Sequence, residues 1–215
     1  SEADPWDFVK GKRMVVTGVP IIAVLTLAAT GTEMNRFAVV QNNETKEKLG
    51  FGYFPMYPKV SFLDPSYTIS VSADYTAFGI TDLIAHALEA YFGKGDASLS
   101  DRFVYSIIKE AIEYGPALMN DLQNYDLRAR IMYAATMALN NLTMYGRESG
   151  DWGVHSIGHV LSVLYDVPHG ASLSIAYPAW MKLHKEKAGN RIEELGKNLF
   201  GTSGIEDCIQ SLEEY

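Results

Sequence analysis

The chain has 215 residues, 47% hydrophobic and 20% charged, which is the ordinary composition of a soluble globular protein with one large domain or two small ones. Its net charge of −8 argues against the clustered positive surface that nucleic-acid binding requires, so we expect no nucleic-acid partner. The single cysteine, Cys208, excludes both a disulfide within the chain and a zinc site built from cysteines.

The longest apolar segment lies at 19–29, near the beginning of the chain, and it is interrupted by Pro20 and Thr26. It is too short and too interrupted to cross a bilayer, and we expect no secretory signal. We therefore expect a cytoplasmic protein without a membrane partner. Ser1 is not an initiator residue and the helical pattern is cut short at 211–215, so we also expect a fragment of a longer protein.

Three short segments in the first third of the chain have the composition of β-strands and are followed by turn residues. They lie at 21–27, 36–41 and 59–63. From about residue 72 onward the spacing of the apolar residues becomes helical. Strands followed by helices indicate a multi-domain chain of the α/β plus all-α type, with part of an α/β domain at 1–72 and a helical-bundle domain at 73–215.

The helical region contains five predicted helices, and two of them have sequence signals at an end. Ser98 or Ser100 is a candidate N-cap for the second helix, and Gly201 lies where a glycine commonly ends a helix. The predicted helices cover 73–92, a segment beginning near 98–100, 125–140, 151–164 and 191–200.

Histidines and one aspartate recur at helical spacing within these helices. Asp82 and His86 are four residues apart, as are His155 and His159, so each pair projects from one face of its helix. His169 follows Pro168, where it lies in a loop or at the start of the next helix. Two such pairs on neighbouring helices can converge on one ion, and this donor set suits Fe²⁺, Zn²⁺, Co²⁺ or Mn²⁺.

The alternative interpretation is that each pair forms an ordinary hydrogen bond and holds no metal. The apolar neighbours of both pairs favour a shared partner, because unpaired buried polar groups are unfavourable. Spacing alone does not decide which three histidines bind. Since no cysteine is available to close a structural zinc shell, the composition favours a catalytic ion with an open coordination position.

A second candidate site is the segment 26–33, where a predicted strand runs into a turn rich in threonine and glycine. Such a turn presents hydroxyls and backbone N–H groups to a phosphate or a ribose. Taken alone, the segment fits an ordinary turn with Thr30 or Thr32 as a helix cap equally well or better.

These residues together resemble the iron-containing (group III) alcohol dehydrogenase family, in particular its NAD(P)H-dependent butanol dehydrogenase and aldehyde reductase branch. The resemblance covers nearly the whole chain, and the ordered set Asp-x₃-His followed by His-x₃-His-x₉-His is its most specific part. The segments that carry it are TGTEMN at 30–35, TKEKLGF at 45–51, FLDP at 62–65, DLIAHALEAYF at 82–92, IEYGP at 112–116, DWGVHSIGH at 151–159 and PHG at 168–170.

The resemblance implies one divalent metal, Fe²⁺ or Zn²⁺, and four ligands: Asp82, His86, His155 and His169. It places His159 beside the substrate and the nicotinamide, where this residue orients them or helps to move the proton.

The resemblance also implies cofactor contacts with NADPH or NADH through Thr26, Thr30 and Lys48. Leu27 and Ala29 depart from the family pattern, which has threonine and glycine there, although neither change removes a ligand. The glycine-rich phosphate loop and the first nucleotide-binding units of the family would precede Ser1, and the end of the helical domain would follow the last residue.

The implied activity is reversible hydride transfer between NAD(P)H and a small aldehyde or primary alcohol such as butanal or butanol, in a homodimer or higher homo-oligomer. Two alternatives remain open: a lyase similar to the metal- and NAD-dependent dehydroquinate synthases, and a helical metal-binding module without catalysis. The donor set does not separate iron from zinc.

Overall fold

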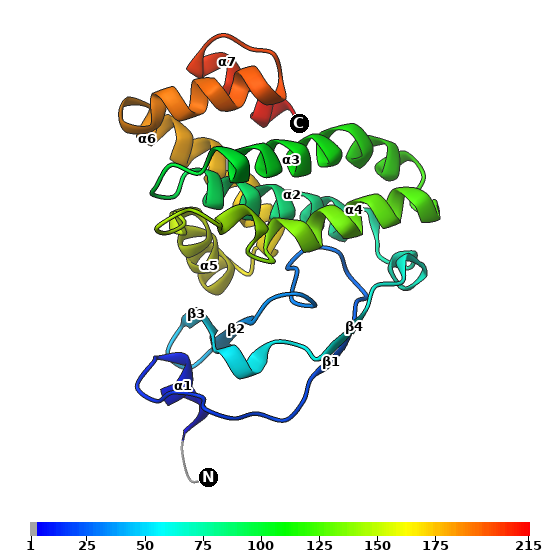
Figure 1. Ribbon diagram of the computed structural model, residues 1–215, viewed down its shortest axis with the longest axis vertical. Helices are drawn as coiled ribbons and strands as arrows, with labels where there is room; N and C mark the ends of the chain where they lie inside the picture. Colours follow the sequence, from blue (N-terminus) through cyan, green and yellow to red (C-terminus); the bar gives the residue numbers. More distant parts are fainter. Residues whose placement is uncertain (1–3) are drawn as a thin grey trace.

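Seven α-helices and two pairs of strands make up residues 4–215, the part of the chain that the computed structural model describes. The larger helices gather at one end of the molecule, and both strand pairs lie at the other end with the short helix α1 (Pro5–Val9), as Figure 1 shows. The chain is therefore mostly helical with a small amount of sheet, as the sequence predicts.

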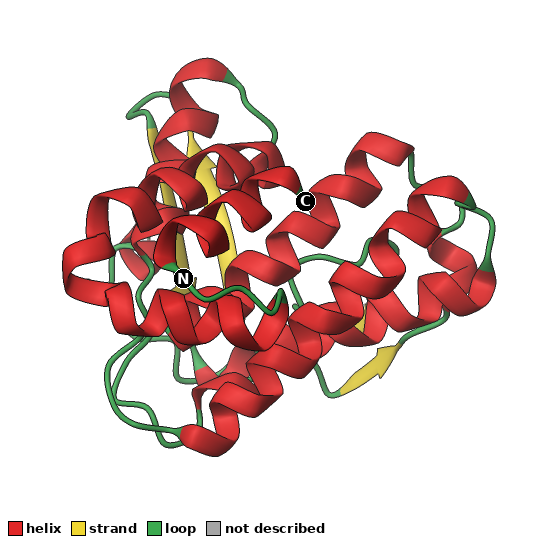
Figure 2. Cartoon of the chain, turned by 90° about the horizontal axis from the view of Figure 1, so that it is seen from above, coloured by secondary structure: helices red, strands yellow, loops and turns green. Residues whose placement is uncertain are grey.

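The two strand pairs differ in direction and lie apart from each other (Figures 1 and 2). Strand β1 (Ile22–Val24) pairs in parallel with β4 (Val60–Phe62), and Ile22 lies opposite Val60. Strands β2 (Phe37–Asn42) and β3 (Glu47–Gly52) form an antiparallel hairpin. Strands are present in all three predicted segments. Strand β3 was not predicted, because its two glycines and two charged residues hide the strand pattern.

The helical part is built around α2, whose buried side chains contact helices on several sides. Leu83, Leu88 and Tyr91 of this helix are at most 1% exposed. Helix α2 contacts α3, α4, α5 and α6. The helices are α2 (Ala73–Tyr91), α3 (Ser98–Asn120), α4 (Tyr125–Ala138), α5 (Gly153–Tyr165), α6 (His169–Leu199) and α7 (Ile205–Glu214).

Two predictions about helix ends were wrong. Neither Ser98 nor Ser100 caps α3: Ala97 is the N-cap residue, and the Ser100 hydroxyl donates to the Tyr145 carbonyl at 2.6 Å. The helix predicted at 191–200 is only the last part of α6, which runs from His169 through Pro178 to Leu199. Burial of Leu173, Trp180 and other residues of α6 against α2 and α7 sustains a helix across a proline that by itself disfavours one.

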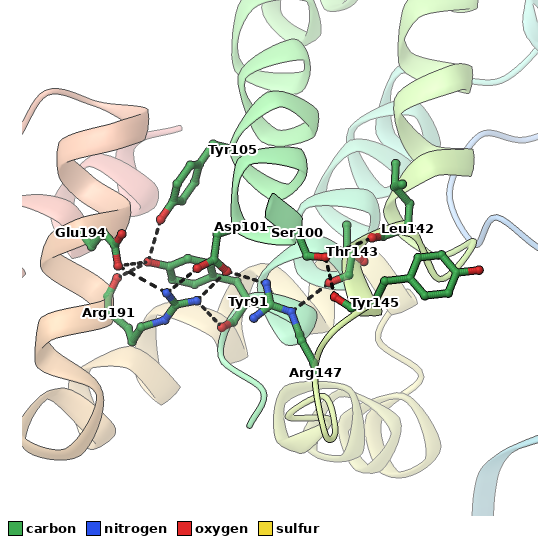
Figure 3. A network of polar contacts seen from close by, with 10 residues as sticks. All are labelled: Tyr91, Ser100, Asp101, Tyr105, Leu142, Thr143, Tyr145, Arg147, Arg191 and Glu194. Carbon is green, nitrogen blue, oxygen red and sulfur yellow. Dashed lines mark hydrogen bonds and ion pairs between the residues drawn. The ribbon is translucent and has the colours of Figure 1, made fainter. Parts of the chain in front are cut away.

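A partly buried ion-pair network joins the end of α2 to α3, α6 and the segment before α5 (Figure 3). Asp101 accepts from both terminal nitrogens of Arg191 at 2.7 and 2.8 Å, and from Arg147 at 2.5 Å. The Arg191 guanidinium also stacks 3.6 Å from the centre of the Tyr91 ring and donates to the Tyr91 carbonyl. These charge-assisted contacts fix the position of the C-terminal end of α2.

Candidate metal centre

One carboxylate oxygen faces three imidazole rings from three different helices. Asp82 Oδ1 lies 3.6 Å from His86 Nε2 on the same helix, 3.4 Å from His155 Nε2 on α5 and 3.6 Å from His169 Nε2 at the first residue of α6. The His86 and His155 rings stack with their centres 4.6 Å apart. Asp82, His86 and His155 are buried, whereas the His169 side chain is 27% exposed, so the cluster is covered on all but the His169 side.

Close helix packing brings these side chains together, and glycines permit it. A Cβ atom at Gly79 of α2 would overlap the Ala28 carbonyl oxygen, so the segment after β1 lies directly against α2. A Cβ atom at Gly158 would lie 2.8 Å from the Ser172 hydroxyl, closer than real Cβ atoms approach other atoms. Helix α5 therefore approaches the beginning of α6 closely at the turn between His155 and His159.

The spacing of the donor atoms fits one ion. Two ligands at ~2.1 Å from an ion in a tetrahedral arrangement are about 3.4 Å apart, which is close to the distances from Asp82 Oδ1. The donor atoms of Asp82, His155 and His169 all lie within 4.8 Å of one another. Asp82 Oδ1 and His155 Nε2 are buried and have no hydrogen-bond partner among the described residues, as expected for atoms that share a cation.

The protonation states of three residues also suit a cation. Burial by itself raises the pKa of Asp82, but the facing histidines lower it to about 2. Burial lowers the pKa of His86 to about 4, and burial and neighbouring histidines lower the pKa of His169 to about 4. At neutral pH the cluster thus offers an anionic carboxylate and two neutral imidazoles, which are the forms that bind metals.

His155 differs from the other histidines because it lies between two carboxylates. Burial lowers the pKa of His155, but the negative charges of the facing Asp82 and Glu89 carboxylates outweigh burial and raise it to about 9. Glu89 is fully buried, and one of its oxygens contacts His155 Nδ1. The sequence prediction missed Glu89, although its spacing of seven residues from Asp82 places it on the same helix face.

His159 and Lys48 line one cavity of about 650 Å³ beside the cluster. The cavity lies between the β2–β3 hairpin and α5, and Phe37, Phe51 and Trp152 contribute to its apolar wall. The His159 ring is 5.3 Å from the His169 ring, and burial together with neighbouring positive charges lowers the pKa of His159 to about 4. Burial likewise lowers the pKa of Lys48.

Thr26 and Thr30, which were expected to contact the cofactor, lie outside this cavity. Both are exposed in the segment after β1, and the Thr30 and Thr32 hydroxyls are 3.3 Å apart. Neither Thr26 nor Thr30 is among the described residues that line the cavity beside the cluster. The fifth histidine, His184, packs against Trp180 with ring centres 4.7 Å apart. The structure thus brings Lys48 and four of the five histidines together, whereas the two threonines are exposed and do not line this cavity.

Sequence models of one family match the two parts of the chain. The model of the Fe-containing alcohol dehydrogenase family, C-terminal, matches residues 76–215, and the model of iron-containing alcohol dehydrogenase matches residues 1–65.

Individual relatives agree with this match. The chain is 40% identical over 200 residues to the probable NADH-dependent butanol dehydrogenase 1 of Bacillus subtilis, covering 93% of this chain and 51% of the relative. It is 35% identical over 207 residues to the NADPH-dependent aldehyde reductase YqhD of Escherichia coli, covering 95% of this chain and 53% of the relative. The chain spans about half the length of these curated relatives.

A crystal structure of NADH-dependent butanol dehydrogenase A from Thermotoga maritima superposes on this fold with a TM-score of 0.96 and 38% identity. The match covers 100% of this chain and 55% of that one. The family models, the identities and the shared fold agree, and the chain therefore belongs to the iron-containing alcohol dehydrogenase family.

Proposed function

We propose that the full-length protein is a metal-dependent alcohol dehydrogenase or aldehyde reductase, which transfers hydride reversibly between NAD(P)H and a small aldehyde or primary alcohol such as butanal or butanol. The observation that carries the proposal is the convergence of His86, His155 and His169 on Asp82 Oδ1. These four residues would hold one Fe²⁺ or Zn²⁺ ion, which supplies Lewis-acid polarisation of the substrate oxygen when bound.

The residues of the neighbouring cavity have distinct proposed roles. His159 is neutral at neutral pH and has no hydrogen-bond partner for Nε2 among the described residues, so it is free to exchange a proton with the substrate oxygen. Lys48 supplies a cationic donor on the hairpin side of the cavity, where it would contact the ribose region of the nicotinamide. The apolar wall formed by Phe37, Phe51 and Trp152 would limit the access of water to the site of hydride transfer.

The domain organisation is also a proposal. Residues 1–72 would form the C-terminal part of an α/β dinucleotide-binding domain, to which Thr26 and Thr30 contribute cofactor contacts, and 73–215 would form the metal-binding domain. The parallel β1–β4 pair supports this division: Val24 is 51% exposed and Phe62 is 55% exposed, whereas parallel strands are usually covered on both faces.

Location and assembly are further proposals. A cytoplasmic location and a homodimer or higher homo-oligomer are the states that we propose for the whole protein. Among the described residues, no helix combines the length and the apolar character that crossing a membrane requires.

The deciding experiment measures metal content and NAD(P)H oxidation together in the full-length protein. We expect about one equivalent of iron or zinc per chain, oxidation of NADPH or NADH with butanal, loss of activity after chelation and recovery after adding the metal. Full activity in the metal-free protein would contradict the proposal. Metal binding without net NAD(P)H consumption would instead indicate the lyase or the non-catalytic module.

A further inference from the structure

Glu89 is a fully buried carboxylate whose two oxygens both face His155. Oε1 accepts a hydrogen bond from the His155 backbone N–H at 3.0 Å, and Oε2 contacts Nδ1 of the His155 ring. No lysine or arginine forms an ion pair with Glu89 within the part of the chain that the structure describes. A carboxylate is rarely buried in this way unless its acceptors are used.

The backbone around Glu89 holds the pair in place. Its carbonyl oxygen accepts from the Asp151 N–H at 2.9 Å, just before α5 begins. The N-cap residue of α5, Trp152, makes no side-chain capping bond, so Glu89 satisfies one of the free N–H groups in the first turn of α5 from outside the helix. The His155 backbone and ring are therefore both fixed relative to α2.

The ring nitrogen that faces away from Glu89 is the one that faces Asp82. His155 Nε2 lies 3.4 Å from Asp82 Oδ1, while Nδ1 contacts Glu89. A carboxylate that accepts from Nδ1–H leaves the Nε2 lone pair free and increases its basicity, which strengthens a bond from Nε2 to a metal.

We propose that Glu89 is a positioning residue for the metal centre: it holds His155 as the tautomer protonated at Nδ1, with Nε2 directed toward the ion. The inference rests on the proposed function only in requiring that His155 binds a metal. It concerns the affinity of the site and the environment of the ion, and so it can be measured without turnover.

Glu89→Gln separates this role from helix capping. Glutamine has one oxygen acceptor and one amide donor. If its oxygen keeps the bond to the His155 backbone, its NH₂ group faces Nδ1 and favours the tautomer protonated at Nε2, which cannot bind the ion. The hydrogen bond that caps α5 at the His155 backbone N–H is then kept, but the His155 ring carries its proton on Nε2 and not on Nδ1. Glu89→Ala removes both interactions.

The experiment uses the full-length protein, stripped of metal and titrated with Co²⁺ against a competing chelator. Glu193→Gln, which removes an exposed carboxylate from α6, is the matched control. We expect Glu89→Gln to bind Co²⁺ about 10- to 100-fold more weakly than wild type, with altered visible bands and a metal-free melting temperature close to wild type. Glu89→Ala should lose both affinity and melting temperature, and Glu193→Gln should change neither.

Unchanged Co²⁺ affinity and spectrum in Glu89→Gln would overturn the inference, whether or not the melting temperature falls. The aldehyde assay on the same wild-type preparation separates this result from failure of the proposed function. A wild-type protein that binds Co²⁺ but oxidises no NAD(P)H contradicts the oxidoreductase function alone, and weaker Co²⁺ binding by Glu89→Gln then still supports the role of Glu89. A wild-type protein that binds no Co²⁺ overturns both.

Discussion

Gly170 and Phe78 are in contact through their main chains. A Cβ atom placed on Gly170 would lie 2.6 Å from the Phe78 Cβ and would overlap the Phe78 carbonyl oxygen. Only a residue without a side chain allows the first turn of α6 to lie this close to α2. His169 precedes Gly170, and Asp82 lies one turn beyond Phe78, so this contact sets the distance between the two side chains.

Gly170→Ala is therefore expected to weaken metal binding by moving His169 away from Asp82. The clash involves main-chain atoms, which cannot move aside as the end of a side chain can, and we expect at least a tenfold loss of Co²⁺ affinity. Gly189→Ala is the control: it lies in the same helix, and its Cβ would meet only the end of the Ile205 side chain. Equal affinity in both variants would show that the α2–α6 contact does not position His169.

His155→Ala and His159→Ala should fail in different ways, although the two residues are one helical turn apart. His155 faces Asp82 Oδ1, so its removal should abolish both metal binding and activity. His159 faces the cavity, so its variant should keep the metal while kcat falls by roughly 10²-fold, the lower range of a lost proton-transfer group. Metal content is measured by elemental analysis and kcat by NAD(P)H oxidation. Loss of metal from His159→Ala would place this residue in the metal shell.

Lys48→Met tests the cationic side of the cavity. Because Lys48 is proposed to bind the cofactor rather than the metal, we expect KM for NAD(P)H to rise about tenfold, equivalent to ~1.4 kcal/mol, with metal content unchanged. Lys109→Met, which removes an exposed lysine from α3, is the control. Initial rates at varied NAD(P)H concentration give kcat and KM. An unchanged KM for NAD(P)H would exclude a role for Lys48 in binding the cofactor.

Asp101→Asn is expected to destabilise the protein by about 3 kcal/mol at neutral pH, because it leaves the buried Arg147 side chain and the partly exposed Arg191 side chain without their carboxylate. Burial raises the pKa of Asp101, but hydrogen bonds and charge interactions with the two arginines outweigh burial and lower it below 3.8. Its stabilising contribution is thus complete above pH ~4 and is lost as the pH falls through the folded-state pKa.

The difference in unfolding free energy between wild type and Asp101→Asn should therefore shrink on acidification below pH ~4. Urea unfolding of the full-length protein at pH 7 and pH 3 measures it. Asp96→Asn, at an exposed position in the segment before α3, is the control and should leave the free energy of unfolding unchanged at both pH values. A constant difference across this range would mean that the carboxylate charge contributes nothing and that the loss comes from packing alone.

The local features of this protein could be predicted from its amino-acid pattern. Apolar periodicity predicted α2 closely because that helix is buried on most sides, and the four-residue spacing placed Asp82 and His86 on one face. It underestimated α6 because Pro178 disfavours a helix locally, whereas burial between α2 and α7 sustains one. Strand β3 was missed because it lacks an alternation of apolar and polar residues. It is stabilised by its pairing with β2, which the sequence pattern does not show.

Which side chains meet depends on how the helices pack against one another. His155 and His159 lie one turn apart on the same helix and have similar neighbours in the sequence. Both line the cavity, but the packing of α5 against α2 brings only His155 to Asp82 and Glu89. Helical periodicity fixes the direction of a side chain around its own axis. The distance between side chains on different helices depends on how closely the helices pack, and here contacts at Gly158 and Gly170 set that distance.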